Sequence, residues 1–467
     1  MGDTSGIGQG PAGGIDRKAK PVRAVVLVPL VPAPREKHAP GSEPSRPRLD
    51  RSPQARLEEA CGLALAIDLD IVHSELVNVP QPRAATLLGT GKIEAAAEII
   101  AEGEVEVVIV DHPLTPVQQR NLEREFKAKV LDRTGLILEI FGRRARTKEG
   151  VLQVELAHLE YQKGRLVRSW THLERQRGGA GFLGGPGETQ IEADRRILQD
   201  KIIKLKRELE RVRRTRDLHR AKRKKVPYPV VAIVGYTNAG KSTLFNRLTG
   251  AGVMAEDMLF ATLDPTLRRV RLPHGATIIL SDTVGFISDL PTHLVAAFRA
   301  TLEEVLEADL ILHVRDMSDP DNAAQAADVL RILGELGIDE GDRERRIVDV
   351  WNKIDRLEPE AREALRAKAA VNPNTIAVSA VTGEGVERLL SLVGERLSGV
   401  MTEATVVLPV DKLSMLPWFY EHAVIDARED REDGSVSLDV RLSEAESIEM
   451  ERRLGLGNPG QKLPWED

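Results

Sequence analysis

The chain has 467 residues, enough for about three domains, and its 66 lysines and arginines against 72 aspartates and glutamates give a net charge of −6. A single cysteine, Cys61, excludes an internal disulfide and a thiolate zinc cluster, which favours a reducing compartment. No apolar stretch approaches the roughly 20 residues of a membrane span, and the glycine-rich segment 1–21 lacks the apolar core of a signal peptide. We therefore expect no membrane span and a disordered N-terminal extension over residues 1–21.

Short β-branched runs alternate with helical patterns in the first third of the chain. Residues 23–31 and 105–111 predict buried strands, and residues 57–69 and 92–103 place apolar side chains at helical spacing. Such alternation is typical of a parallel α/β domain, which we place at residues 22–150. The segment 31–54 breaks the pattern with prolines and charged residues, so we expect a solvated loop there.

A basic block follows the first domain. Residues 143–225 contain 24 lysines and arginines against 11 aspartates and glutamates, a local charge of +13 that the whole-chain value conceals. Within it, residues 151–176 and 188–225 carry apolar residues near helical spacing and flank a glycine-rich loop. Because a short loop makes consecutive helices antiparallel neighbours, we predict an α-helical hairpin over residues 151–226.

A phosphate-binding motif opens the next domain, predicted as a Ras-like P-loop domain over residues 227–400. After a predicted strand the chain has Gly-x-x-x-x-Gly-Lys-Ser, and a helical pattern follows, which is the context that this motif requires. The backbone N–H groups of such a loop surround phosphate oxygens, Lys241 offers a positive charge to the β- and γ-phosphates, and the Ser242 hydroxyl can bind Mg²⁺. The residues expected at the nucleotide are Gly235, Tyr236, Thr237, Asn238, Ala239, Gly240, Lys241, Ser242 and Thr243.

The second motif is Asp-Thr-Val-Gly, formed by Asp282, Thr283, Val284 and Gly285 after another predicted strand. An aspartate at the carboxyl end of a strand in a doubly wound sheet faces the phosphate crevice and can hold Mg²⁺ through water. The N–H of Gly285 can sense the γ-phosphate. Lys241, Asp282 and Gly285 are therefore the expected catalytic groups.

Two motifs point to guanine. Asn352, Lys353, Ile354 and Asp355 form Asn-Lys-x-Asp at the end of a predicted strand. The carboxylate of Asp355 can accept both the N1–H and the N2–H₂ of guanine, which selects GTP over ATP. Ser379 and Ala380 follow the next predicted strand, where a backbone N–H can meet the guanine carbonyl.

The segment between the first two motifs should supply a switch threonine that binds Mg²⁺ when the γ-phosphate orders it. Thr262 is the first choice, Thr266 is the second, and a plain loop threonine is the alternative for either. The residues expected near the nucleotide are Phe260, Ala261, Thr262, Leu263 and Asp264. Ser242 and Thr262 are thus the predicted metal ligands.

The last part of the chain, residues 401–467, predicts a small α+β domain. Two alternating runs flank Asp433 and Gly434, which is typical of a β-hairpin, and a short helical pattern precedes them.

The combined motifs resemble the HflX GTPases of the Obg–HflX superfamily over roughly residues 22–440. The segments that carry the resemblance are GYTNAGKST, LFATLDPT, DTVGF and NKID, preceded by SWTHLERQ and GGAGFLGGPGETQIEADRR. The resemblance implies a cytoplasmic, Mg²⁺-dependent GTPase that binds the large (50S) ribosomal subunit and splits stalled or idle ribosomes under stress. It also implies that the N-terminal domain and the hairpin contact ribosomal RNA. We expect a monomer with no DNA partner and no integral membrane association, although a fraction could lie peripherally at the membrane.

The basic block independently favours RNA, because each phosphate that a cation neutralises releases counterions. The expected contacts are Arg177, Arg195, Arg196, Lys222, Arg223, Lys224 and Lys225, with Phe182 of the glycine-rich tip stacking on a base. The alternatives are a solvated helix face and an inert loop. At the level of function, the alternative is an RNA-binding assembly or scaffold protein for which GTP is a mainly structural ligand.

Two residues bear on hydrolysis. Ras-like enzymes place a glutamine directly after Asp-x-x-Gly, but this chain has Phe286, which cannot orient water. We therefore expect slow turnover until the ribosome or an ordered switch loop completes the site. Asn238 recurs in GTPases that use a monovalent cation near the β–γ bridge, so a potassium ion is a further hypothesis.

Overall fold

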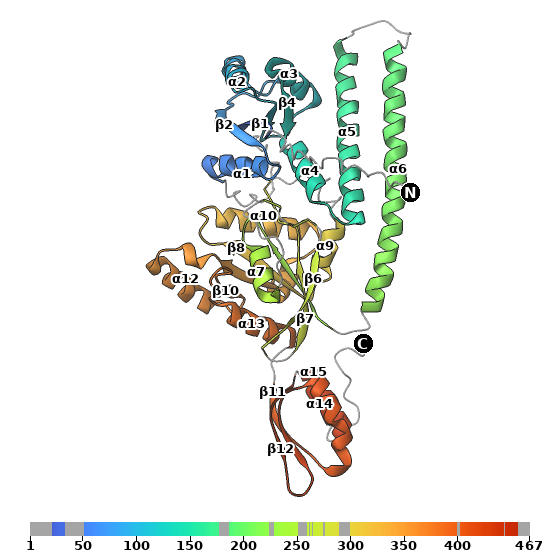
Figure 1. Cartoon of the computed structure of the whole chain (residues 1–467), viewed down its shortest axis with the longest axis vertical. Coiled ribbons are helices and arrows are strands. Elements are labelled where there is room, and N and C mark those ends of the chain that lie inside the picture. Colours follow the sequence, from blue (N-terminus) through green and yellow to red (C-terminus); the bar gives the residue numbers. More distant parts are fainter. Residues whose placement is uncertain are drawn as a thin grey trace, which may run out of the picture.

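Three β-sheets and a long helical hairpin make up the computed structural model (Figure 1). The residues that it describes are 21–32, 51–176, 186–223, 228–250, 259–260, 262–263, 265–273, 276–288, 299–398, 402–442 and 444–455. The predicted fold class, α/β domains with a helical hairpin and a small α+β unit, is confirmed. We keep the domain limits proposed from the sequence as working divisions.

The N-terminal sheet has the strand order β2-β1-β3-β4, and all its neighbouring strands are parallel. Side chains of β1 alternate between two cores, as the pleat requires: Val25 and Leu27 pack towards α2 and α3, whereas Val26 and Val28 pack towards α1 and α4. The elements are β1 (Arg23–Leu30), α1 (Pro53–Leu65), β2 (Asp70–Asn78), α2 (Thr90–Glu102), β3 (Val107–Val110), α3 (Pro116–Phe126), β4 (Lys129–Asp132) and α4 (Arg133–Arg144).

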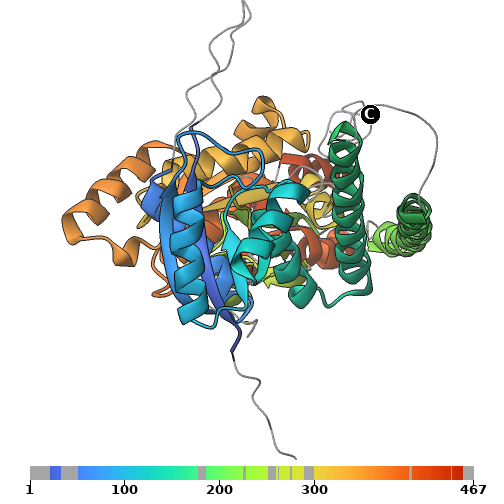
Figure 2. The ribbon, with the colours of Figure 1, turned by 90° about the horizontal axis from the view of Figure 1, so that it is seen from above.

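The hairpin consists of α5 (Lys148–Gln176) and α6 (Pro186–Arg223), which lie side by side (Figure 1). A buried apolar seam joins them, formed by Leu152, Leu156, Ile202, Leu205 and Leu209. In Figure 2, α6 is seen nearly end-on and stands apart from the N-terminal strands. The hairpin therefore presents much of α6 to solvent.

The GTPase-type sheet has the order β10-β9-β8-β5-β7-β6, parallel except for the edge strand β6. The P-loop follows the central strand β5. Because β7, β8, β9 and β10 run in the same direction as β5, the loops that follow them lie at the same edge of the sheet as the P-loop. Its elements are β5 (Val230–Gly235), α7 (Lys241–Thr249), β6 (Thr266–Arg271), β7 (Thr277–Asp282), α9 (Arg299–Leu306), β8 (Leu310–Asp316), α10 (Asn322–Glu335), α11 (Glu340–Arg346), β9 (Ile347–Asn352), η1 (Ile354–Arg356), α12 (Pro359–Val371), β10 (Thr375–Ala377) and α13 (Val386–Ser398).

The C-terminal unit is an antiparallel sheet of order β11-β13-β12 with its own core around Phe419 and Leu438. The predicted hairpin is present, formed by β12 and β13. The elements are β11 (Thr402–Leu408), η2 (Val410–Met415), α14 (Leu416–His422), β12 (Val424–Asp430), β13 (Val436–Leu442) and α15 (Glu444–Leu454).

The sequence prediction was wrong in several local details. Strands β2 and β4 were not predicted, because β2 is an edge strand with only Val77 buried and β4 has only four residues. The predicted loop 31–54 is wrong at its end: Arg51 is packed and Ser52 caps α1, accepting a hydrogen bond from Ala55 N at 3.2 Å. Helix α5 begins at Lys148, three residues before its predicted start, and α6 begins at Pro186, two residues before its predicted start.

Several predictions lie outside the described residues: the extension 1–20, most of the loop 31–54, and the glycine-rich tip 177–185. No helix within the described ranges is both long and apolar enough to cross a membrane.

A buried charge cluster joins β8 and β9. Asp349 accepts a hydrogen bond from Arg315 Nη1 at 2.9 Å and lies 3.0 Å from His313 Nδ1. Burial alone would raise the pKa of Asp349, but the hydrogen bond with His313 and the charge of Arg315 lower it to about 2. The side chain is 29 % exposed, so the shift bears on stability.

Because this pKa lies below the unfolded value, Asp349 stabilises the fold at neutral pH, and its contribution is lost as the pH falls from about 4 to 2. We expect Asp349→Asn to lower the free energy of unfolding by about 2 kcal/mol at pH 7 and by progressively less below pH 4. Thermal unfolding of both proteins between pH 3 and 7 measures the difference. Glu335→Gln, which breaks a surface pair with Arg331, should cost below about 1 kcal/mol. A deficit for Asp349→Asn that stayed constant with pH would contradict the assignment.

Candidate nucleotide-binding site

The P-loop connects β5 to α7 and depends on two glycines. Gly235 has a φ of +152°, and a Cβ at this position would lie 2.2 Å from the carbonyl oxygen of Val314. Gly240 has a φ of +91°, and a Cβ there would lie 2.3 Å from Asn352 Nδ2. Neither position has room for a side chain, so the loop backbone can approach its neighbours closely.

Lys241 is the first residue of α7, and its side chain is buried beneath the loop. Its Nζ donates to the carbonyl oxygen of Tyr236 at 2.7 Å. Burial lowers the pKa of Lys241 to about 8, against the opposing effect of the Asp282 carboxylate. Phosphate oxygens within reach of Nζ would favour the charged amine.

Ser242, Thr262 and Asp282 meet at one point beside the P-loop. The hydroxyls of Ser242 and Thr262 donate to Asp282 Oδ2 at 2.8 and 2.9 Å and lie 3.1 Å apart. Burial raises the pKa of Asp282, although Lys241 favours its charged form. The second carboxylate oxygen, Oδ1, is buried and has no hydrogen-bond partner among the described residues.

This donor set fits Mg²⁺, which prefers oxygen ligands and retains several waters. Ser242 and Thr262 would hold the ion, and Asp282 would hold one of its waters; the bound ion would neutralise phosphate charge. Thr266, the second choice for the switch threonine, instead begins β6 and pairs with Asp282 in the β6–β7 ladder. The geometry therefore favours Thr262.

The segment after Asp282 runs directly under the P-loop. Thr283 donates its hydroxyl to the carbonyl oxygen of Ile233 at 2.6 Å, so this side chain fixes the segment to β5. A Cβ on Gly285 would lie 3.0 Å from Lys241 Nζ, which places the Gly285 backbone beside the lysine. Phe286 is buried and pairs with the loop through two backbone hydrogen bonds, Thr237 N to Phe286 O and Phe286 N to Gly235 O.

Asn352 joins the P-loop to the segment after β10. Its Nδ2 donates to the carbonyl oxygen of Ala239 at 2.9 Å, and its Oδ1 accepts from Ala380 N at 2.9 Å. Both ends of the amide are therefore occupied by backbone groups. Asn352 holds these two loops together.

Asp355 has a carboxylate that is open to a ligand. It is partly exposed, and its Oδ1 accepts a hydrogen bond from Ser379 Oγ at 2.6 Å, which orients the carboxylate. Lys353 has a φ of +63° and forms a salt bridge with Asp316 at 2.7 Å. Its buried stem lies beside Gly240, at the side of the loop.

The other predicted nucleotide residues divide by where their side chains lie. Several face the protein core, so only their backbone is available to a ligand: Tyr236, Ala239, Phe260, Leu263, Val284 and Ile354. Asn238 is exposed with a φ of +59°, Thr243 is half-buried in α7, and Ala261 and Asp264 lie outside the described residues.

Of the residues predicted to contact RNA, some lie on α6 and the others lie outside the described residues. Arg195 and Arg196 are exposed on α6, and Lys222 and Arg223 lie at its C-terminal end. The remaining candidates, Arg177, Phe182, Lys224 and Lys225, lie outside the described residues.

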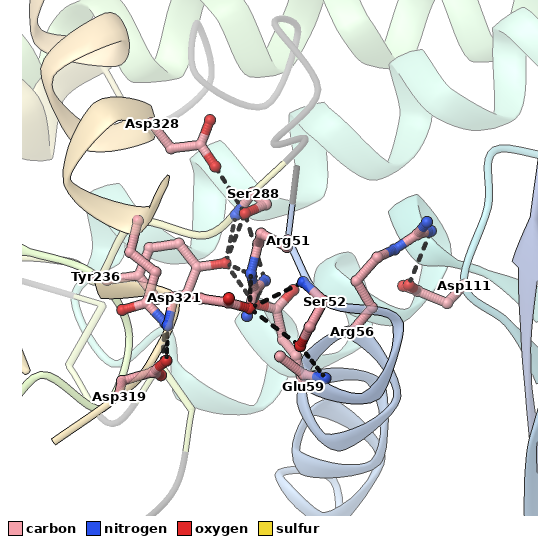
Figure 3. Close-up of polar contacts among 12 residues, drawn as sticks. Arg51, Ser52, Arg56, Glu59, Asp111, Tyr236, Ser288, Asp319, Asp321 and Asp328 are labelled. Atoms are coloured by element: carbon pink, nitrogen blue, oxygen red, sulfur yellow. Dashed lines mark hydrogen bonds and ion pairs between the residues drawn. The ribbon is translucent and has the colours of Figure 1, made fainter. Parts of the chain in front are cut away.

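Sequence reasoning missed the charged residues that contact the site from the N-terminal domain. Arg51 and Glu59 face Tyr236 and Ser288 across the domain boundary (Figure 3), and Arg133 reaches Ser288 as well. Burial alone would raise the pKa of Glu59, but Arg133 and Arg51 keep it below its ordinary value. No spacing rule could have found these contacts, because more than 150 residues separate the partners.

Four protein families match successive parts of the chain. Residues 54–142 match "GTP-binding GTPase N-terminal", residues 144–223 match "GTP-binding GTPase Middle Region", residues 230–353 match "50S ribosome-binding GTPase" and residues 364–465 match "HflX C-terminal domain".

Full-length relatives agree with these matches. The chain is 54% identical over 377 residues to GTPase HflX of Magnetococcus marinus, covering 80% of this chain and 86% of the relative. It is 48% identical over 361 residues to GTPase HflX of Escherichia coli, covering 77% and 83%. It is also similar to the crystal structure of a GTP-binding protein from Sulfolobus solfataricus in complex with GDP, with 23% identity, a TM-score of 0.43 and coverage of 81% and 99%.

The geometry and the relatives lead to one activity. The described residues form a P-loop, a cluster of three oxygen-bearing side chains that fits Mg²⁺ and a partly exposed carboxylate at Asp355, and relatives that match over most of their length are GTPases. The chain binds and hydrolyses GTP, and it belongs to the HflX family of GTPases.

Proposed function

We propose that this GTPase binds the large ribosomal subunit and that its GTP-bound form splits stalled or idle ribosomes under stress. The observation that carries the proposal is the match of residues 230–353 to the family described as "50S ribosome-binding GTPase". We further propose that it acts in the cytoplasm as a monomer and uses Mg²⁺.

The exposed side of α6 supports a contact with ribosomal RNA. Arg195, Arg196, Lys201, Lys204 and Arg207 are exposed there, and none of them forms a salt bridge with another described residue. A helix of 38 residues extends for roughly 57 Å, so α6 can carry positive charge well away from the nucleotide. Cations without protein partners are available to phosphates.

Hydrolysis would end the ribosome-bound state. Lys241 would stabilise charge on the γ-phosphate during attack by water, and the N–H of Gly285 would respond to whether that phosphate is present. Phe286 is buried below the P-loop and cannot orient the water. We therefore expect the ribosome to complete the site and accelerate turnover.

Charge reversal on α6 tests the RNA contact. We expect Arg195→Glu with Arg196→Glu to weaken binding to large subunits and to reduce the slope of log affinity against log salt by about 1 to 2. The matched control, Arg331→Glu with Arg345→Glu, reverses two charges on the GTPase domain and should bind normally. Sedimentation with large subunits at several salt concentrations measures both. Equal loss in the two double variants would contradict a specific contact.

Sedimentation of 70S ribosomes with the wild-type chain separates the two candidate functions. Splitting with GTP or a non-hydrolysable analogue, but not with GDP, would support the switch. Binding without splitting in all three cases would favour the RNA-binding scaffold with GTP as a structural ligand.

A further inference from the structure

The boundary between the N-terminal domain and the GTPase domain contains buried charges. Glu59 on α1 accepts hydrogen bonds from Arg133 Nη2 at 2.6 Å, from Arg51 Nη1 and from the hydroxyl of Tyr236. Arg133 also donates to Asp111 Oδ1 at 2.5 Å. Four of these residues, Glu59, Arg51, Arg133 and Asp111, come from the N-terminal domain, and the fifth, Tyr236, belongs to the P-loop. Figure 3 shows Arg51, Glu59, Asp111 and Tyr236.

This cluster holds the backbone of one residue of the GTPase domain, Ser288, at both its N–H and its carbonyl group. The N–H of Ser288 donates to the Tyr236 hydroxyl at 2.8 Å, and the carbonyl oxygen of Ser288 accepts from Arg133 Nη2 at 2.8 Å. The Ser288 hydroxyl donates to Asp328 Oδ2 at 2.7 Å. Ser288 lies three residues after Gly285, so its position limits where the Gly285 N–H can lie.

The same segment is fixed at further points. Asp282 ends β7 before Gly285, and Phe286, which follows Gly285, pairs with Gly235 and Thr237 of the P-loop. The segment from Asp282 to Ser288 is thus attached at both ends. At Ser288 the N-terminal domain contributes the hydrogen bond from Arg133, beside those to Tyr236 and Asp328 of the GTPase domain.

The first switch segment also touches the N-terminal domain. The rings of Phe260 and Phe141 pack edge to face with centroids 4.8 Å apart, and a Cβ on Gly62 would lie 3.1 Å from Leu259 Cδ1. In this arrangement Thr262 lies beside Ser242, as a γ-phosphate-bound state requires. The N-terminal domain therefore packs on both switch segments in the arrangement that suits GTP.

A cluster of buried ion pairs such as that of Glu59 and Arg133 contributes more to the geometry of the contact than to the stability of the fold. Replacing a buried ion pair by apolar residues is often neutral or stabilising, whereas removing one partner is strongly unfavourable. The cluster of Glu59 and Arg133 fixes hydrogen-bond donors and acceptors at defined positions, which an apolar contact would not do.

We propose that Glu59 and Arg133 are positioning residues for GTP hydrolysis: through the Tyr236 hydroxyl and the Ser288 carbonyl they hold the Gly285 segment against the γ-phosphate. The proposal rests on GTP hydrolysis alone and does not depend on ribosome binding. Because coupling between sites is reciprocal, GTP tightens the contact between the two domains, whereas GDP, which has no γ-phosphate, does not.

The sharpest test removes one hydroxyl. Tyr236→Phe leaves the ring in place but deprives the Ser288 N–H and Glu59 of their partner. We expect affinity for a non-hydrolysable GTP analogue to fall roughly tenfold, the effect of one buried hydrogen bond, and kcat to fall with it, while GDP affinity changes less than about twofold. Tyr161→Phe is the matched control, because its buried hydroxyl donates to Asp132 at 2.6 Å, away from the switch segments; it should change neither affinity.

A double-mutant cycle in the full-length chain completes the test. Glu59→Gln should lower the ratio of GTP-analogue to GDP affinity as Tyr236→Phe does, and the double variant should lower it no further than either single variant, because both act through one contact. An equal loss of GDP and GTP-analogue affinity in Tyr236→Phe would overturn the proposal, and so would additive losses in the double variant or an unchanged ratio.

Discussion

The Lys241→Ala variant is expected to hydrolyse GTP on the order of 10²- to 10³-fold more slowly than the wild-type chain. Lys241 Nζ is buried, donates to the P-loop carbonyl of Tyr236 and lies beside the Gly285 backbone. With GTP bound, this amine would be a positive charge at the phosphates in a site from which water is largely excluded.

Single-turnover phosphate release with excess enzyme measures this effect apart from product release. Lys368→Ala is the control, since this lysine belongs to the same domain but lies over the Trp351 ring, 5.9 Å from its centroid. Activity of Lys241→Ala within tenfold of wild type would show that the amine does not stabilise the transition state. The same variant separates the candidate functions, because ribosome splitting should disappear in a switch while RNA binding persists in both.

The second large effect concerns Asn352. Its amide makes two buried hydrogen bonds, to Ala239 O and from Ala380 N, and each contributes about 1–2 kcal/mol. We expect Asn352→Ala to weaken GTP and GDP alike, by roughly a hundredfold or about 3 kcal/mol. The affinity for both nucleotides falls because the lost hydrogen bonds hold the phosphate loop and the base loop together. The γ-phosphate is not involved in these hydrogen bonds.

Calorimetric titration with GDP and with a GTP analogue checks this expectation. Asn374→Ala is the control, because Asn374 is half-buried and donates to Glu344 O at 3.0 Å, away from the site; it should bind both nucleotides normally. Asn352→Asp keeps the acceptor for Ala380 N but places a carboxylate oxygen against the carbonyl oxygen of Ala239, so a loss at least as large as that of Asn352→Ala is expected. A loss of affinity for the GTP analogue alone would contradict the role of Asn352 in holding the two loops together.

The motifs indicated which residues come together around the P-loop because each motif dictates local backbone geometry. Glycine is required at 235 and 240 because φ is positive there and because a Cβ would lie less than 2.5 Å from a neighbouring atom. The glycines of the sequence motif mark these two positions. Asp282 ends β7 and Ser242 follows the P-loop at the start of α7, as their motifs indicate, whereas Thr262 lies between these two motifs, outside any strand. The roles of these residues towards GTP and Mg²⁺ stay predictions.

Other features could not be predicted, because they depend on contacts between distant parts of the chain. Asn352 fits the sequence motif, but its bond to Ala239 spans 113 residues, and nothing near Asn352 indicates it. Glu59 lies in an ordinary amphipathic helix, where a buried glutamate looks like a surface residue until its partners are known. The sequence of strand β2 lacks an alternation of apolar and polar residues, because this edge strand buries few of its side chains.

The apolar core beneath the N-terminal sheet continues without a break into the GTPase domain, from Ile137 and Phe141 to Phe260, Phe286 and Ile287. During synthesis Ile137 and Phe141 are made more than a hundred residues before Phe260, Phe286 and Ile287. Until the β7 region has emerged, α4 presents an apolar face to water, a state that invites association with other chains. The two domains thus share one folding step, and the nascent chain passes through a period in which it depends on protection.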